Sequence, residues 1–176
     1  MKSIAENKKK ENIVEYILYM YRMEDLLRAY DFNLEDIKQY VLSHEKIPEK
    51  ERAESDQWYK ELAKRMKSQG IEKEGHLSET QKLVDELAAL HWRLIKKDPD
   101  YFNLNVKTKP YLLDLIQAAG EKNPGHEVQI FINCLHGLLL SRLNGRKVAS
   151  PFLEAAAVFG EALAYLNIAY QKKSLI

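Results

Sequence analysis

Apolar residues recur every three to four positions along most of this chain, which is the spacing of one face of an α-helix. Near the start, Tyr16, Met20, Met23 and Leu27 follow that spacing. No segment shows the strict alternation of apolar and polar residues that is typical of a half-buried strand. The pattern therefore predicts an all-α fold, a helical bundle of six to seven helices.

Capping residues, prolines and glycines set the expected ends of these helices. Asn33 is a good cap, Pro48 suits a first helical turn, and Ser78 with Gln81 three residues later has the pattern of a capping box. Residues 101–109 are expected to be a loop or a broken helical turn, with Pro110 opening the next helix. The predicted helices span residues 4–30, 33–43, 49–69, 78–97, 110–120, 124–143 and 151–170.

The length of 176 residues predicts a single domain over residues 1–176, with a soft division in the polar stretch near residues 70–77. Residues 1–97 contain 19 basic and 19 acidic side chains, whereas residues 98–176 contain 8 and 7. The second part is thus much less charged, and it contains two strongly apolar segments, 128–143 and 152–170. We expect this C-terminal helix pair to form the centre of the bundle.

Composition narrows the functional classes. The formal net charge of +1 provides no basic field for nucleic acid, so binding to DNA or RNA is not expected. Cys134, the single cysteine, rules out an internal disulfide and is interpreted as a small buried hydrophobe. No uninterrupted apolar run reaches about 18 residues, and the N-terminus has no leader pattern, so we expect a cytoplasmic protein without a membrane-spanning helix.

Polar residues that could carry chemistry are few. Gln129, Asn133 and His136 fall four and three residues apart, so they share one face of an otherwise apolar helix. With His91, they could line a polar pocket; a solvent-facing strip or a hydrogen-bonded core are the alternatives. A lone histidine such as His91 on an apolar face is usually a hydrogen-bonded core residue.

The remaining histidines, His44, His76 and His126, lie near predicted helix ends, where capping and exposure explain them. No histidine, cysteine and carboxylate spacing matches a metal site, and no cofactor motif is present. The sequence predicts no catalytic residues and no metal or cofactor.

Small residues recur in the last two predicted helices. Ala156, Gly160 and Ala164 are spaced by four, and Gly137 and Ser141 have the same spacing in the preceding helix. Such a stripe lets another helix approach closely. It predicts close packing of these two helices or, alternatively, a two-fold contact between the last helices of two chains.

These observations favour a non-enzymatic protein that acts through protein–protein contacts, with self-association as the main expectation. An unknown protein partner is compatible with the same surfaces. The alternative is a small-molecule-binding or regulatory module, whose apolar cavity would lie between the helices predicted at 4–30, 78–97 and 124–143. The residues expected around that cavity are Tyr16, Tyr19, Met20, Met23, Trp92 and His136.

Two segments resemble a known family. Residues 12–29, NIVEYILYMYRMEDLLRA, and residues 137–143, GLLLSRL, are similar to the family catalogued as domain of unknown function 4924, from Bacteroidetes-type bacteria. The resemblance covers most of the chain, but it rests on amphipathic helix faces. It implies a soluble bacterial all-helical protein and carries over no catalytic residue.

Overall fold

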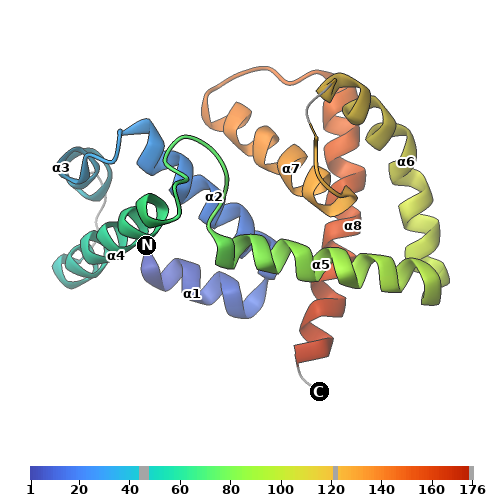
Figure 1. Cartoon of the computed structure of the whole chain (residues 1–176), viewed down its shortest axis with the longest axis horizontal. Helices are drawn as coiled ribbons and strands as arrows, with labels where there is room; N and C mark the ends of the chain where they lie inside the picture. The colour runs from blue at the N-terminus through green and yellow to red at the C-terminus, as the bar shows by residue number, and fades with distance from the viewer. Residues whose placement is uncertain (44–47, 121–122, 175–176) are drawn as a thin grey trace. The chain divides into compact units, whose positions relative to one another are not determined.

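The computed structural model confirms the all-α prediction (Figure 1). It describes residues 1–43, 48–120 and 123–174, and within these ranges there are eight α-helices, one short π-helical turn and no strand. By its internal contacts the chain divides into two compact units, Met1–Lys82 and Leu83–Ile176. This boundary lies a few residues after the stretch near residues 70–77, where a soft division was expected.

The first unit is built from α1 (Lys2–Glu11), α2 (Ile13–Ala29), α3 (Leu34–Ile37), the π-helical turn η1 (Lys38–Leu42) and α4 (Glu49–Ser68). Its core is a continuous cluster of buried side chains from α2 and α4, joined by residues of the shorter elements. The helix predicted over residues 49–69 is confirmed as α4. The cluster includes Tyr19, Met20, Met23, Leu27, Trp58, Tyr59, Leu62 and Met66.

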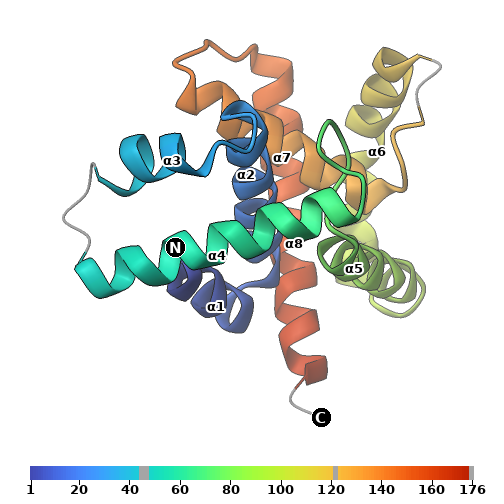
Figure 2. The same cartoon turned by 60° about the vertical axis from the view of Figure 1, so that its left-hand side comes forward.

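The second unit contains most of α5 (Ser78–Lys97), followed by α6 (Pro99–Ala119), α7 (Glu127–Leu143) and α8 (Ser150–Ser174). The long helix α8 packs against both α7 and α6, and Figure 2 shows it beside α7. Phe131 of α7 stacks on Phe159 of α8 with ring centroids 4.6 Å apart. The two apolar C-terminal segments therefore pair with each other within the second unit, and the first unit has a core of its own.

The predicted first helix is in fact two helices, which corrects the expectation of one helix over residues 4–30. Asn12 has an extended backbone, with φ −152° and ψ 103°, so the helical path stops there. Its N–H donates to the carbonyl of Lys8, and its side-chain oxygen accepts from the N–H of Glu15. Asparagine is among the best N-caps, so Asn12 both closes α1 and starts α2.

The expected loop at residues 101–109 and the helix start at Pro110 were also wrong. Helix α6 begins at Pro99, capped by Asp98, and continues through Pro110 to Ala119. Proline removes one hydrogen bond to the carbonyl four residues earlier. That carbonyl belongs to Val106, an exposed residue, so water reaches the position and the helix continues.

The other boundaries lie close to prediction, with two exceptions. The second helix ends in the π-helical turn η1, and α7 starts at Glu127 with His126 as its cap rather than at Asn123-Pro124. The side chain of His126 accepts the N–H of Gln129, which confirms its expected capping role. His44 lies outside the described residues.

Candidate functional site

The most connected polar group in the second unit centres on His91 of α5, which is fully buried. Its Nδ1 lies 2.7 Å from the hydroxyl oxygen of Tyr101, and its Nε2 lies 3.2 Å from a carboxylate oxygen of Glu127. The other oxygen of Glu127 accepts from Nζ of Lys109 at 2.6 Å. This His91 network therefore joins α5, α6 and the first turn of α7.

The protonation of this network follows from the pKa directions. Burial tends to raise the pKa of Glu127, but hydrogen bonds from His91 and Lys109 outweigh it and leave that pKa below the ordinary value. The carboxylate therefore only accepts, and Nε2 of His91 donates to it. The hydroxyl of Tyr101, which is hydrogen-bonded to Nδ1, keeps its proton because burial raises its pKa.

Aromatic rings enclose His91. The rings of Trp92, Tyr101 and Phe131 all meet it edge to face, with centroids 5.0–5.9 Å away. This environment matches the sequence-based interpretation of His91 as a hydrogen-bonded core residue. Through these contacts His91 of α5 is joined to residues of both α6 and α7.

A second buried pair lies in the first unit. The carboxylate of Glu24 on α2 is fully buried; it lies 2.7 Å from Nδ1 of His76 and accepts the N–H of Leu77 at 3.2 Å. The imidazole of His76 stacks face to face on Tyr21. His76 is therefore not simply an exposed helix-end residue, as expected, because it fastens the segment before α5 to α2.

The predicted polar row on α7 is only partly assembled. Nε2 of Gln129 donates to Oδ1 of Asn133 at 2.9 Å, and Asn133 is exposed while Gln129 and His136 are half-buried. His91 makes its hydrogen bonds elsewhere, with Tyr101 and Glu127. A single pocket formed by these four residues stays a prediction.

The two glycines of the small-residue stripe face side chains of the neighbouring helix. A Cβ atom added at Gly160 would meet the side chain of Leu135 at 4.0 Å, and one added at Gly137 would meet Phe152 at 3.7 Å. Both distances are ordinary van der Waals contacts with side chains. Ala156 is buried, Ser141 is half-buried and Ala164 is exposed, so a contact between copies through this stripe stays a prediction.

The apolar and aromatic residues predicted to line the alternative cavity have different surroundings in the structure. Tyr19, Met20 and Met23 pack into the core of the first unit, and Tyr16 packs against it. Trp92 is 45% exposed. Cys134 is buried, and burial raises the pKa of its thiol to about 11, so it is a poor nucleophile at neutral pH.

Helix α6 presents an apolar surface that the sequence analysis missed. Tyr101, Asn105, Thr108 and Leu112 form its buried side. Four large apolar side chains lie on another side of the helix, roughly 100° around its axis from the buried side, and these are exposed. We call Phe102, Val106, Leu113 and Ile116 the α6 stripe; their exposed fractions are 47%, 51%, 60% and 43%.

The sequence signal for the α6 stripe was present. Phe102, Val106, Lys109, Leu113 and Ile116 are separated by four, three, four and three residues, which is the heptad spacing of helix pairing. Assigning residues 101–109 to a loop hid it, because the spacing has meaning only if the helix continues through Pro110. The structure restores that continuity.

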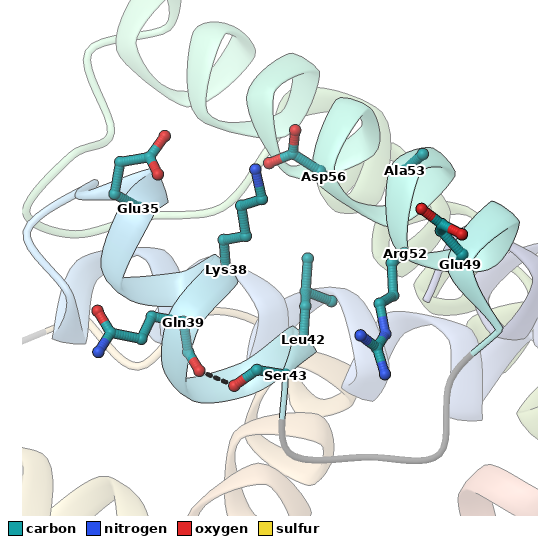
Figure 3. Close-up of a pocket in the computed structure, with 9 residues that line it drawn as sticks. All are labelled: Glu35, Lys38, Gln39, Leu42, Ser43, Glu49, Arg52, Ala53 and Asp56. Carbon is teal, nitrogen blue, oxygen red and sulfur yellow. Dashed lines mark hydrogen bonds between the residues drawn. The ribbon is translucent and has the colours of Figure 1, made fainter.

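A groove in the first unit lies between η1 and α4 and has a volume of about 600 Å³ (Figure 3). Leu42 lies at its base, and Figure 3 shows Lys38 extended toward Asp56 across it. Asp56 is also paired with Lys60 at 2.7 Å. Three carboxylates and two cations line this groove, so its charge selects no single class of ligand. Its charged lining consists of Glu35, Lys38, Glu49, Arg52 and Asp56.

A metal site has no support in the described residues, since no group of three or more His, Cys, Asp or Glu side chains is placed to hold an ion.

The family assignment comes from comparison with known proteins. A family model matches residues 2–175, nearly the whole chain. The chain belongs to the family described as Domain of unknown function (DUF4924).

Membership in the DUF4924 family confirms the resemblance found in residues 12–29 and 137–143. No curated protein and no solved structure matches the chain. Within the described residues, one helix of this DUF4924 protein, over Ser150–Lys172 of α8, is long and apolar enough to cross a membrane by length and composition. Core helices of soluble proteins meet the same criterion, so this observation by itself is weak evidence.

Proposed function

We propose that this protein is non-enzymatic and acts through self-association, in which two copies pair along the α6 stripe. The observation that carries this proposal is a concentration of apolar surface. Ten large hydrophobic side chains are exposed among the described residues, and four of them form this one stripe. Exposed apolar surface gathered in one place is characteristic of interaction sites, whereas isolated exposed residues are normal.

A second copy suits the stripe because of its spacing and its charge. The heptad spacing is the one by which helices pair through a narrow apolar seam. The only charged position in the seam is Lys109, and its ammonium group is neutralised by Glu127 at 2.6 Å. Two identical seams therefore meet without net repulsion. Because only four partly exposed side chains contribute from each copy, we expect micromolar association.

The test uses a matched pair of substitutions. Leu113 in the stripe and Leu143 at the end of α7 are 60% and 63% exposed. We expect Leu113→Glu to weaken self-association by more than tenfold in sedimentation velocity, because it places a charge in the apolar seam. The control Leu143→Glu should sediment like the wild type. Neither change should alter the free energy of unfolding by more than about 0.5 kcal/mol.

Several outcomes would contradict this proposal. A wild-type protein that remains monomeric at high concentration would do so, as would equal sedimentation of the two variants. A loss of thermal stability in Leu113→Glu, with no change in mass, would mean that another segment of the same chain covers the stripe.

We also propose a cytoplasmic location. In its support, α8 places Phe159, Leu163 and Leu166 in a packed interior rather than leaving a wholly apolar circumference for lipid. Expression followed by separation of soluble and membrane fractions tests this proposal. Recovery of the wild-type protein in the membrane fraction, resistant to high salt, would overturn it.

A further inference from the structure

A second groove, in the second unit, combines an apolar surface with two cations. It lies between the C-terminal halves of α5 and α8 and has a volume of about 390 Å³. Leu94 of α5 and Ile168 of α8 contribute apolar surface, and Ile168 is 54% exposed. Arg93 and Lys172 carry the positive charges, one from each helix. This volume falls within the usual range for small-molecule sites.

One acidic residue lines the groove, and its hydrogen-bonding capacity is largely used. Asp98 accepts from the hydroxyl of Tyr165 at 2.7 Å and, through its other oxygen, from the N–H groups of Asp100 and Tyr101 at 3.1 Å. The hydrogen bond from Tyr165, together with those backbone N–H groups, holds the pKa of Asp98 below its ordinary value. Asp98 is thus a helix cap tied to α8, and it is poorly placed to bind a cationic ligand.

The two cations differ from Asp98 because they are not held by other described groups of the protein. Arg93 and Lys172 are both exposed, and neither forms an ion pair with a described residue. Their long apolar stems suit a position beside Leu94 and Ile168, with the charged ends in water. Together with Asp98, the groove has a net charge of +1, and the uncommitted charges are both positive. An anion gains charge-assisted hydrogen bonds there without displacing an existing partner.

We propose that this groove binds a small organic anion with an apolar body, such as a carboxylate bearing a short hydrocarbon chain. The anionic group lies between the guanidinium group of Arg93 and the ammonium group of Lys172. The apolar body covers Leu94 and Ile168 and removes their surface from water. Both helices contribute to this site, which is separate from the α6 stripe and from the mixed-charge groove between η1 and α4.

The probes for the test share an eight-carbon chain and carry an anionic, a neutral or a cationic head group. Octanoate, octanol and octylammonium have the same chain length, and their binding to the full chain is measured by titration calorimetry and by amide chemical shifts. We expect octanoate to bind at least tenfold more tightly than octylammonium, with octanol between them. The largest shifts should occur around Leu94 and Ile168. Equal binding of the three probes, or no binding of octanoate, would overturn the proposal.

Matched substitutions locate the interaction. Arg93→Gln and Lys172→Gln should each weaken octanoate binding about five- to tenfold, since each removes one charge-assisted hydrogen bond. Arg142→Gln removes an exposed arginine from α7, outside the groove, and should leave binding unchanged. If all three variants bind octanoate equally, the anion does not bind in this groove. Leu113→Glu should retain full octanoate binding, which separates this result from the test of self-association.

Discussion

Each unit contains one buried histidine–glutamate pair, and the two pairs are arranged in opposite ways. In the first unit the carboxylate of Glu24 is fully buried, and the His76 side chain is 23% exposed. In the second unit the His91 side chain is almost fully buried, and the Glu127 side chain is 18% exposed. The charge that would be costly to bury therefore lies deep in one pair and near the solvent in the other.

This difference indicates which residue each unit depends on. Glu24 has no access to water, so its hydrogen bonds with His76 and the N–H of Leu77 must replace those that water would make. Glu127 reaches water and Lys109, so its charge is compensated even when His91 is changed. Both pairs link segments that are distant in sequence, yet removal of the carboxylate should have unequal consequences.

The largest effect is expected for the buried carboxylate. Glu24→Ala leaves an N–H and an imidazole without their acceptor in a buried place, and we expect a loss of about 3 kcal/mol or more in the free energy of unfolding. The matched change Glu127→Ala should cost about 1–2 kcal/mol, because the Glu127 side chain is 18% exposed and water can take its place beside Lys109 and Nε2 of His91. Urea denaturation followed by circular dichroism measures both. Equal losses would show that burial of the carboxylate is not what distinguishes the pairs.

The hydroxyl that completes the His91 network should have an intermediate effect. Tyr101→Phe removes the donor to Nδ1 of a fully buried imidazole, so we expect a loss of about 1–2 kcal/mol. Tyr165→Phe removes the hydroxyl that donates to Asp98 at a more accessible place, and its cost should stay near 0.5 kcal/mol. The same denaturation measurement checks both variants. A larger loss for Tyr165→Phe would contradict the central role of the His91 network.

Most helices could be predicted from the sequence because their ends carry strong local signals. Several observed helix ends lie within about one residue of such a signal in the sequence: Asn33, Ser78, Asn144-Gly145 and Ser150. Pro110 was interpreted as a helix start because a proline usually breaks a helix, but here it lies in the interior of α6, four residues after the exposed Val106. Asn12 was overlooked because the apolar stripe continues on both sides of it.

The candidate sites were harder to predict because they depend on tertiary contacts. His91 could be interpreted as a core residue, but its partners Tyr101 and Glu127 lie 10 and 36 residues away in sequence. The groove between Arg93 and Lys172 joins residues even further apart. Helical periodicity identifies which side of one helix is apolar. It does not say which of two apolar sides a neighbour will cover, and this is why the α6 stripe was missed.

The smallest effect concerns pH and the exposed member of the second pair. The folded pKa of Glu127 lies below its ordinary value of 4.5, so the ionised carboxylate stabilises the fold above that pH. The stabilisation is lost as the pH falls through the folded pKa, where Glu127 takes up a proton. In Glu127→Gln the side chain does not titrate. The difference in unfolding free energy between the wild type and this variant should therefore be constant above about pH 5 and shrink below it. Urea denaturation at a series of pH values measures this difference, and a value that stays constant down to the acid limit would show that the His91 network does not depend on the charge of Glu127.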